Sequence, residues 1–192
     1  ANAAIDLMDG KVQLYGQAAG YVGVHVPEEG AKRVDPAIES RIGFRGKVDF
    51  DNFGPTFLWQ IEGGNADNGG FDANAPWTWS NNGQFGARDT YLGLEFDGVG
   101  SLKFGRQLVA AYNYVDWPHS NPGLGNVFDW NNDIGAGYED RADNVIRFDS
   151  ASFGGFNFQA TVSNMASNAK AAAYSVGSSY GTSKFNVHAG RS

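Results

Sequence analysis

Two oppositely charged stretches contain the side chains best suited to binding an ion or a polar solute. Residues 32–47 carry five basic side chains, whereas residues 116–143 are acidic with Arg141 as their only Lys or Arg. Carboxylates in a loop rich in Gly and Asn can solubilise the chain or bind Ca²⁺. Residues 129–133 do not fit an EF-hand loop. A structural Ca²⁺ therefore stays an open possibility, and no other cofactor or metal site is expected.

Motifs for bond-making chemistry are missing from the sequence. His25, His119 and His188 are scattered and show no HExxH spacing, and no G-x-S-x-G elbow occurs. Gly154-Gly155 follows a turn between strands, not the strand-to-helix junction that cradles a phosphate. The absence of Cys removes thiol chemistry and Cys-ligated metals. We therefore expect a protein that is not an enzyme.

The elements that must position the charges are strands with two different faces. Residues 39–50 alternate between apolar side chains such as Ile42 and Phe44 and charged ones such as Arg41 and Arg45. Residues 11–26 alternate in the same way, over a length that exceeds a usual soluble strand of about 5–6 residues. A charged face needs water and an apolar face needs an apolar neighbour. A water-filled barrel in lipid satisfies both, and so does a one-sided soluble sheet.

The spacing of the remaining segments predicts about nine strands in total. Seven further strands are expected near residues 56–63, 88–96, 101–107, 144–150, 155–164, 171–180 and 184–190. Short Gly- and Asp-containing turns fall at 51–55, 97–100, 151–155 and 181–183, whereas the connections at 27–38, 64–87 and 108–143 are long. Short turns that alternate with long loops are typical of outer-membrane barrels, and soluble sandwiches seldom sort their loops this way.

Composition narrows the class of partner. The 192 residues have a formal net charge of −7, which disfavours nucleic-acid binding because phosphate contacts need Lys and Arg. No stretch of 18 or more apolar residues is present, so no transmembrane helix is predicted. The opening Ala1-Asn2-Ala3-Ala4 lacks the basic and apolar regions of a signal peptide.

Six segments resemble the general porin family of Gram-negative bacteria. In order, they read VQLYGQAAG, SRIGFRG, FLWQIE, ARDTYLGL, GSLKFGRQ and RADNVIRFDSASFGGFNF. Each segment is a weak signal by itself, and six in the family's order are a strong one. The similarity runs from residue 11 to about residue 164 and continues more weakly to the end.

The resemblance implies an all-β transmembrane antiparallel β-barrel of sixteen strands. Residues 1–192 would form a single, partial barrel domain, the N-terminal half, because about nine strands are present and the family's terminal aromatic residue is missing after Arg191-Ser192. The implied location is the bacterial outer membrane, crossed many times. The implied partners are membrane lipid, lipopolysaccharide, small hydrophilic solutes and two further copies in a homotrimer, with no nucleic acid.

In this family the third long loop folds into the barrel and faces a basic wall, and here that loop spans about residues 108–143. The resemblance implies a constriction with an acidic loop of Asp116, Asp129, Asp133, Glu139 and Asp140 and a basic wall of Arg41, Arg45, Arg88, Arg141 and Arg147. Gln17 stands where some members have a basic residue. Opposed charges across water create a transverse field that orients dipolar solutes, and the excess of carboxylates favours cations.

The expected function is passive diffusion of ions and small hydrophilic solutes, and three alternatives stay open. Loop tryptophans could stack on sugar rings in a pore selective for oligosaccharides or chitooligosaccharides; the candidates are Trp77, Trp79, Trp117 and Trp130. In the simpler interpretation they anchor loops or interfaces. An outer-membrane adhesin and a soluble carbohydrate-binding β-sandwich are the other two alternatives.

Overall fold

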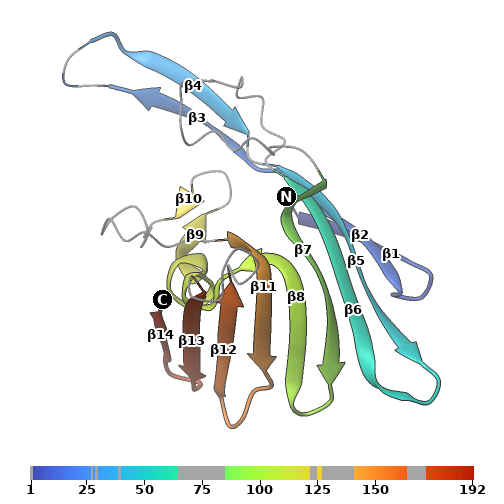
Figure 1. Ribbon diagram of the computed structural model, residues 1–192. Coiled ribbons are helices and arrows are strands. Elements are labelled where there is room, and N and C mark those ends of the chain that lie inside the picture. Colours follow the sequence, from blue (N-terminus) through green and yellow to red (C-terminus); the bar gives the residue numbers. More distant parts are fainter. Residues whose placement is uncertain are drawn as a thin grey trace.

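The structure is a computed structural model that describes residues 2–26, 28, 30–38, 40–64, 85–121, 125–126, 141–163 and 172–192. Ten antiparallel strands form one curved sheet in which neighbours in sequence are neighbours in space, apart from two inserted hairpins (Figure 1). Their order is β1 (Asn2–Leu7), β2 (Val12–Gln17), β5 (Arg41–Phe50), β6 (Phe53–Gly64), β7 (Phe85–Phe96), β8 (Gly100–Leu108), β11 (Arg141–Ser150), β12 (Phe156–Ser163), β13 (Ala173–Gly181) and β14 (Asn186–Arg191).

The N-terminal region differs from the prediction in two ways. The expected strand over residues 11–26 is interrupted at residues 18–19, and its second part, β3 (Gly20–His25), pairs with β4 (Arg33–Ile38) inside the expected loop 27–38. This hairpin projects from the sheet (Figure 1). β1 was not predicted, because its Ala-rich sequence has little strand preference of its own. β1 pairs with β2 across a turn at Met8, Asp9 and Gly10, and all three residues have positive φ.

The register gives the sheet one apolar and one polar face. Side chains opposite each other on adjacent strands share a face, and Leu14 lies opposite Phe44 as Gln13 lies opposite Arg45. The apolar face carries exposed side chains across the sheet, including Ile42, Ile61, Leu92, Phe104 and Ile146. The polar face carries Arg45, Gln60 and Tyr91 in one row and Lys103, Arg147, Thr161 and Ser175 in another. The two faces expected for residues 39–50 therefore extend across neighbouring strands.

Short turns join consecutive strands at one end of the sheet (Figure 1). Asp51 and Asn52 connect β5 to β6, and Asn52 adopts the positive φ of 64° that such a tight hairpin needs. Residues 97–99 and 151–155 make the corresponding turns before β8 and β12. The predicted long connection 64–87 lies, for the most part, outside the described residues. No helix in the described part of the chain is long and apolar enough to cross a membrane.

Residues 109–119 leave β8 and pack against the polar face of the sheet. They form a single π-helical turn, η1 (Tyr112–Asp116), and a 3₁₀ turn, η2 (Trp117–His119), followed by the short pair β9 (Ser120–Asn121) and β10 (Gly125–Asn126). Four hydrogen bonds tie the segment to β12 and β13: Ala110 N to Thr161 Oγ1 (3.4 Å), Ala111 N to Ser175 Oγ (2.8 Å), Asn113 Nδ2 to Gln159 Oε1 (2.9 Å) and the Tyr114 hydroxyl to Asn157 Oδ1. The predicted loop 108–143 thus begins with a segment that is hydrogen-bonded to β12 and β13.

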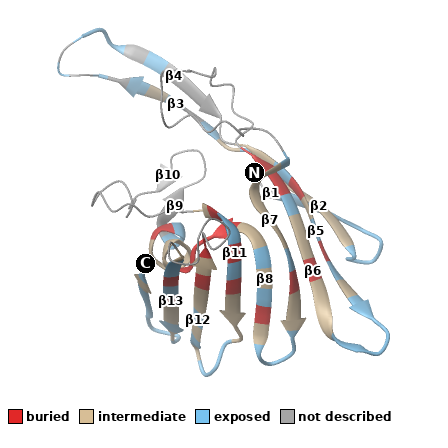
Figure 2. Cartoon of the chain, in the orientation of Figure 1, coloured by how far each residue is buried: buried red, intermediate tan, exposed pale blue. Residues whose placement is uncertain are grey.

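Most of the buried apolar side chains among the described residues lie in or near this segment, and Figure 2 shows further buried positions along the strands. Ala110 and Val145 are fully buried, and Val109, Ala142 and Val145 form a small apolar cluster against which Tyr112 packs. Two glycines provide the space. A Cβ atom on Gly177 would lie 2.7 Å from the Ala110 carbonyl oxygen and 2.6 Å from the Tyr114 ring, and one on Gly190 would lie 3.0 Å from Ala111 Cα.

We predict that Gly177→Ala loosens residues 109–119 while the strands stay paired. The added methyl group overlaps the Ala110 carbonyl and the Tyr114 ring, and overpacking of this kind costs about 1–3 kcal/mol. Hydrogen–deuterium exchange at the amides of Ala110 and Ala111 in the full-length protein should become faster. Gly54→Ala is the matched control, because nothing lies within 4 Å of its Cβ position. Equal protection of both amides in the two variants would contradict the prediction.

Candidate functional site

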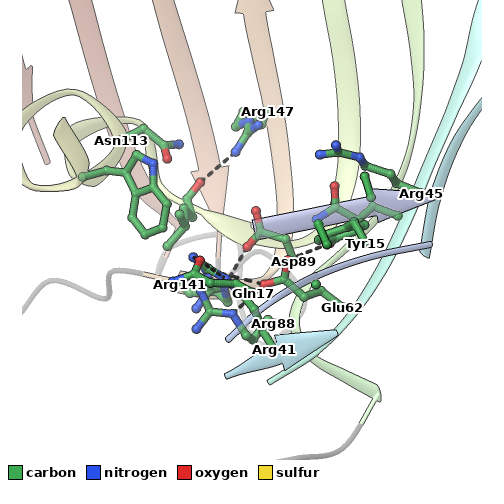
Figure 3. A pocket seen from close by; sticks show the side chains of 16 residues that line it. Tyr15, Gln17, Arg41, Arg45, Glu62, Arg88, Asp89, Asn113, Arg141 and Arg147 are labelled. Carbon is green, nitrogen blue, oxygen red and sulfur yellow. Dashed lines mark hydrogen bonds and ion pairs between the residues drawn. The ribbon is translucent and has the colours of Figure 1, made fainter. Parts of the chain in front are cut away.

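The polar face of the sheet holds a cavity of about 690 Å³ between the strands and residues 109–119. Five arginines from three strands line it: Arg41 and Arg45 from β5, Arg88 from β7, and Arg141 and Arg147 from β11. Figure 3 shows Arg41, Arg88 and Arg141 gathered beside Glu62 and Asp89, with Arg45 and Arg147 set apart from them. Period-two alternation places Arg41, Arg45 and Arg147 on the polar parity of their strands, and Arg141 begins β11. Arg88 is an exception to this parity, and it lies where the pairing of β6 with β7 shifts register between Ile61 and Gly63.

Glu62 is the buried centre of one group of these side chains. Its exposed fraction is 6%, and Arg88 Nε approaches Oε1 to 2.5 Å. The Tyr15 hydroxyl donates to Oε2 at 2.6 Å, and Arg41 Nη1 lies 3.9 Å from Oε1. Arg41 is fixed on its other side by Gln17, whose Oε1 accepts from Nε at 2.9 Å and also from Nη2. One carboxylate therefore holds two cations side by side and is itself almost inaccessible.

Two further carboxylates hold the remaining buried cations. Asp89 Oδ1 pairs with Arg141 Nε at 2.7 Å. Asp149 pairs with Arg147 Nε at 3.0 Å and with Lys103 Nζ at 2.7 Å. The Asp89 and Asp149 side chains are each 17% exposed, so these pairs are partly shielded from screening by salt.

Arg45 is held differently from the other four arginines. Its guanidinium lies 4.6 Å from the centre of the Tyr15 ring, and its Nε donates to Gln13 Oε1 at 2.6 Å. No carboxylate of the described residues pairs with it, and the residue is exposed. A cation fixed by an aromatic face and one amide keeps its charge available to a passing solute.

The described lining of the cavity is positively charged. Five arginines face two carboxylates, Glu62 and Asp89, and both carboxylates are mostly buried behind the guanidinium groups they bind. A concave surface of one sign with low-dielectric walls concentrates ions of the opposite sign. The arrangement suits the binding and orientation of anionic or dipolar solutes, and these contacts supply no nucleophile with an adjacent base.

Residues 109–119 contribute the opposite side of the cavity. Trp117 is 39% exposed and lines the cavity, and the guanidinium of Arg41 lies 5.4 Å from the centre of its ring. Burial raises the pKa of the Tyr114 phenol above its ordinary value, and the Asp149 carboxylate adds to the shift. Tyr114 therefore remains a hydrogen-bond donor to Asn157 at all ordinary pH values.

The structure brings together all five arginines of the expected basic wall, and Trp117 with them. Asp116 is placed differently from the expectation: its exposed fraction is 2%, and it is not among the residues lining the cavity. It sits in the π-helical turn that packs on the strands, so its carboxylate is enclosed by protein. Seven other expected residues lie outside the described part of the chain: Asp129, Asp133, Glu139, Asp140, Trp77, Trp79 and Trp130.

Sequence reasoning missed Glu62, Asp89 and Tyr15. The parity of Glu62 was a usable signal, since Gln60 and Glu62 alternate with Trp59 and Ile61. The position of Asp89 could not be read, because residues 88–96 are apolar at both parities and a register shift separates Ile61 from Gly63 opposite them. No group of three metal-binding side chains occurs among the described residues. Most of the loop carboxylates behind the calcium hypothesis lie outside them.

A family model described as Gram-negative porin matches residues 1–192. The chain belongs to this family. The predicted fold class, an all-β antiparallel barrel of the porin type, is confirmed, as is the location in the bacterial outer membrane. Porins are channel proteins that reside in the membrane, which agrees with the exposed apolar face of the sheet.

This porin is similar to two individual proteins. It is 48% identical to chitoporin from Vibrio furnissii over 125 residues, which cover 65% of this chain and 32% of that protein. It superposes on the anion-selective porin from Comamonas acidovorans with a TM-score of 0.69 and 21% identity, covering 93% of this chain and 56% of that one. The second likeness shows the fold alone. The chain spans about a third of the length of the chitoporin.

Glu62→Gln should destabilise this porin by about 1–3 kcal/mol, because Arg41 and Arg88 lose the charge that offsets theirs in a buried position. Urea titration of the full-length protein in lipid vesicles measures the free energy of unfolding. Glu95→Gln is the matched control: the Glu95 side chain is 40% exposed and pairs with Lys47, so its loss should cost under about 1 kcal/mol. Equal losses in the two variants would show that burial of Glu62 is unimportant.

Proposed function

We propose that the full-length protein forms a water-filled channel for passive diffusion of ions and small hydrophilic solutes across the outer membrane. The observation that carries the proposal is a charged cavity on the polar face of a sheet whose opposite face exposes apolar side chains. A barrel that encloses water and faces lipid gives both surfaces a suitable neighbour. Transport is driven by the solute gradient, and no covalent chemistry takes part.

The chain is proposed to form the N-terminal half of a sixteen-stranded barrel, as one domain over residues 1–192. Its ten strands end in two sheet edges, β1 and β14, that a barrel would pair with further strands. Three copies are proposed to assemble as a homotrimer in contact with membrane lipid and lipopolysaccharide. These points rest on family membership and on the 56% share of the superposed porin that the chain covers.

Residues 108–143 are proposed to narrow this channel. The anchoring of residues 109–119 to β12 and β13 supports this proposal, because it directs the segment across the polar face. In the proposed constriction the arginine wall opposes Asp129, Asp133, Glu139 and Asp140. The field between them orders water and orients dipolar solutes, so the pore filters by charge as well as by width.

The first experiment is a conductance measurement on the full-length protein in a planar lipid bilayer. Stepwise openings, in groups of three for a trimer, are the expected result. A protein that inserts into the bilayer and never conducts would favour the adhesin alternative instead. A protein that stays soluble without detergent would favour the soluble carbohydrate-binding sandwich.

A second candidate function is a saccharide-selective channel. The chain is 48% identical to chitoporin over the matched residues, and Trp117 exposes part of its ring to the cavity. Aromatic faces can stack on sugar rings, and an aromatic contact contributes about 0.5–1.5 kcal/mol beyond the area it buries.

Trp117→Ala tests this candidate. Chitohexaose should block the wild-type current with saturable kinetics, and the variant should bind it about 2–10-fold more weakly, as expected for that contact energy. Tyr174→Ala is the control, because Tyr174 is 70% exposed on the apolar parity of β13 and does not line the cavity. Equal block in wild type and Trp117→Ala, or equal block by maltohexaose, would argue against a chitooligosaccharide channel.

A further inference from the structure

A second cavity of about 460 Å³ follows the first along the polar face, toward the end of the sheet with the short turns. Its charged lining residues are Asp6, Arg45, Lys47, Glu95 and Lys103. The two cavities, termed here the upper and the lower cavity, share Arg45 and Gln60. A solute that leaves the upper cavity along this wall therefore passes these two side chains and enters the lower one.

Positive charge continues from one cavity into the other. Arg147 of the upper cavity and Lys103 of the lower cavity are direct cross-strand partners. Both bind Asp149, whose side chain is 17% exposed, at 3.0 Å and 2.7 Å respectively. One recessed carboxylate thus holds two cations at the boundary, and Lys103 is further fixed 5.2 Å from the centre of the Tyr91 ring.

Arg45 lies where the two cavities meet, and some of its N–H donors have no acceptor among the described residues. Gln13 engages only its Nε, and the described residues offer no acceptor to its two terminal nitrogens. A guanidinium presents these nitrogens as a planar fork that fits a carboxylate or a phosphate. Arg45 can therefore contact an anion in either cavity without breaking a contact of its own.

The lower cavity keeps the same sign of charge but holds its cations more loosely. Among its described lining residues three cations face two carboxylates. Lys47 pairs with Glu95 at 2.5 Å, and these side chains are 64% and 40% exposed. An ion pair so exposed is weak, so an incoming anion can compete with Glu95 for the ammonium group.

We propose that the lower cavity is a second binding station for anionic solutes bearing a carboxylate or a phosphate, which Arg45 passes on from the upper cavity. The proposal rests on the proposed channel function and names a solute class and a path for it. Conduction is favoured when binding is divided among several weak sites, because an ion that binds at one tight site leaves it slowly. Two stations that share one arginine meet this requirement.

Block of the current by inorganic phosphate, added to one side of a bilayer holding the full-length protein, tests the proposal. Lys47→Gln should weaken block from the short-turn side about 3–10-fold and leave block from the opposite side near its wild-type value. Arg45→Gln should weaken block from both sides. Lys184→Gln, a change of the same charge in the connection between β13 and β14, is the control and should leave both unchanged. Acetate in place of phosphate shows whether carboxylates are held equally.

Equal block from the short-turn side in Lys47→Gln and Lys184→Gln would overturn the second station and leave the channel function intact. Failure of the wild-type protein to conduct would overturn the channel function instead. In that case, calorimetric titration of the detergent-solubilised protein with phosphate tests whether the lower cavity binds the anion. Weaker binding in Lys47→Gln supports it, and identical isotherms reject it.

Discussion

Every buried backbone N–H and C=O group must have a partner where water is excluded, and this constraint governs the structure. An antiparallel sheet meets it through pairing between adjacent strands, and the ten strands of the main sheet, from β1 to β14, are paired in that manner. Pleating then sends successive side chains to opposite faces. The strands that expose Ile42 and Phe104 on one face therefore present Arg45 and Lys103 on the other.

Burial of the carboxylates behind the cations sets the electrostatic character of the polar face. Glu62 and Asp149 each hold two basic side chains and are largely inaccessible, so the accessible lining has an excess of positive charge. This sign is opposite to the net charge of the chain, −7. The charge of this surface therefore depends on which side chains are buried. It does not follow from the net charge of the chain.

Small side chains on the strands let residues 109–119 lie close to the polar face of the sheet. Gly177 and Gly190 leave room for Ala110 and Ala111, and Thr161 and Ser175 offer hydroxyl acceptors to the two backbone amides. The segment could not lie so close to strands with larger side chains. Trp117 reaches the cavity because this anchoring precedes it in the chain.

The sequence by itself predicted most strands of the sheet, the two faces of residues 39–50 and the short turns, because period-two alternation and turn composition are properties of nearby residues. The resemblance to the porin family singled out the five arginines that line the cavity. The tertiary structure decided what depends on residues far apart in sequence. Glu62 meets Tyr15 and Arg88 only through strand register, and Asp116 is enclosed because its helical turn packs on the sheet. β1 and the β3–β4 hairpin likewise owe their strands to pairing partners more than to their own residue preferences.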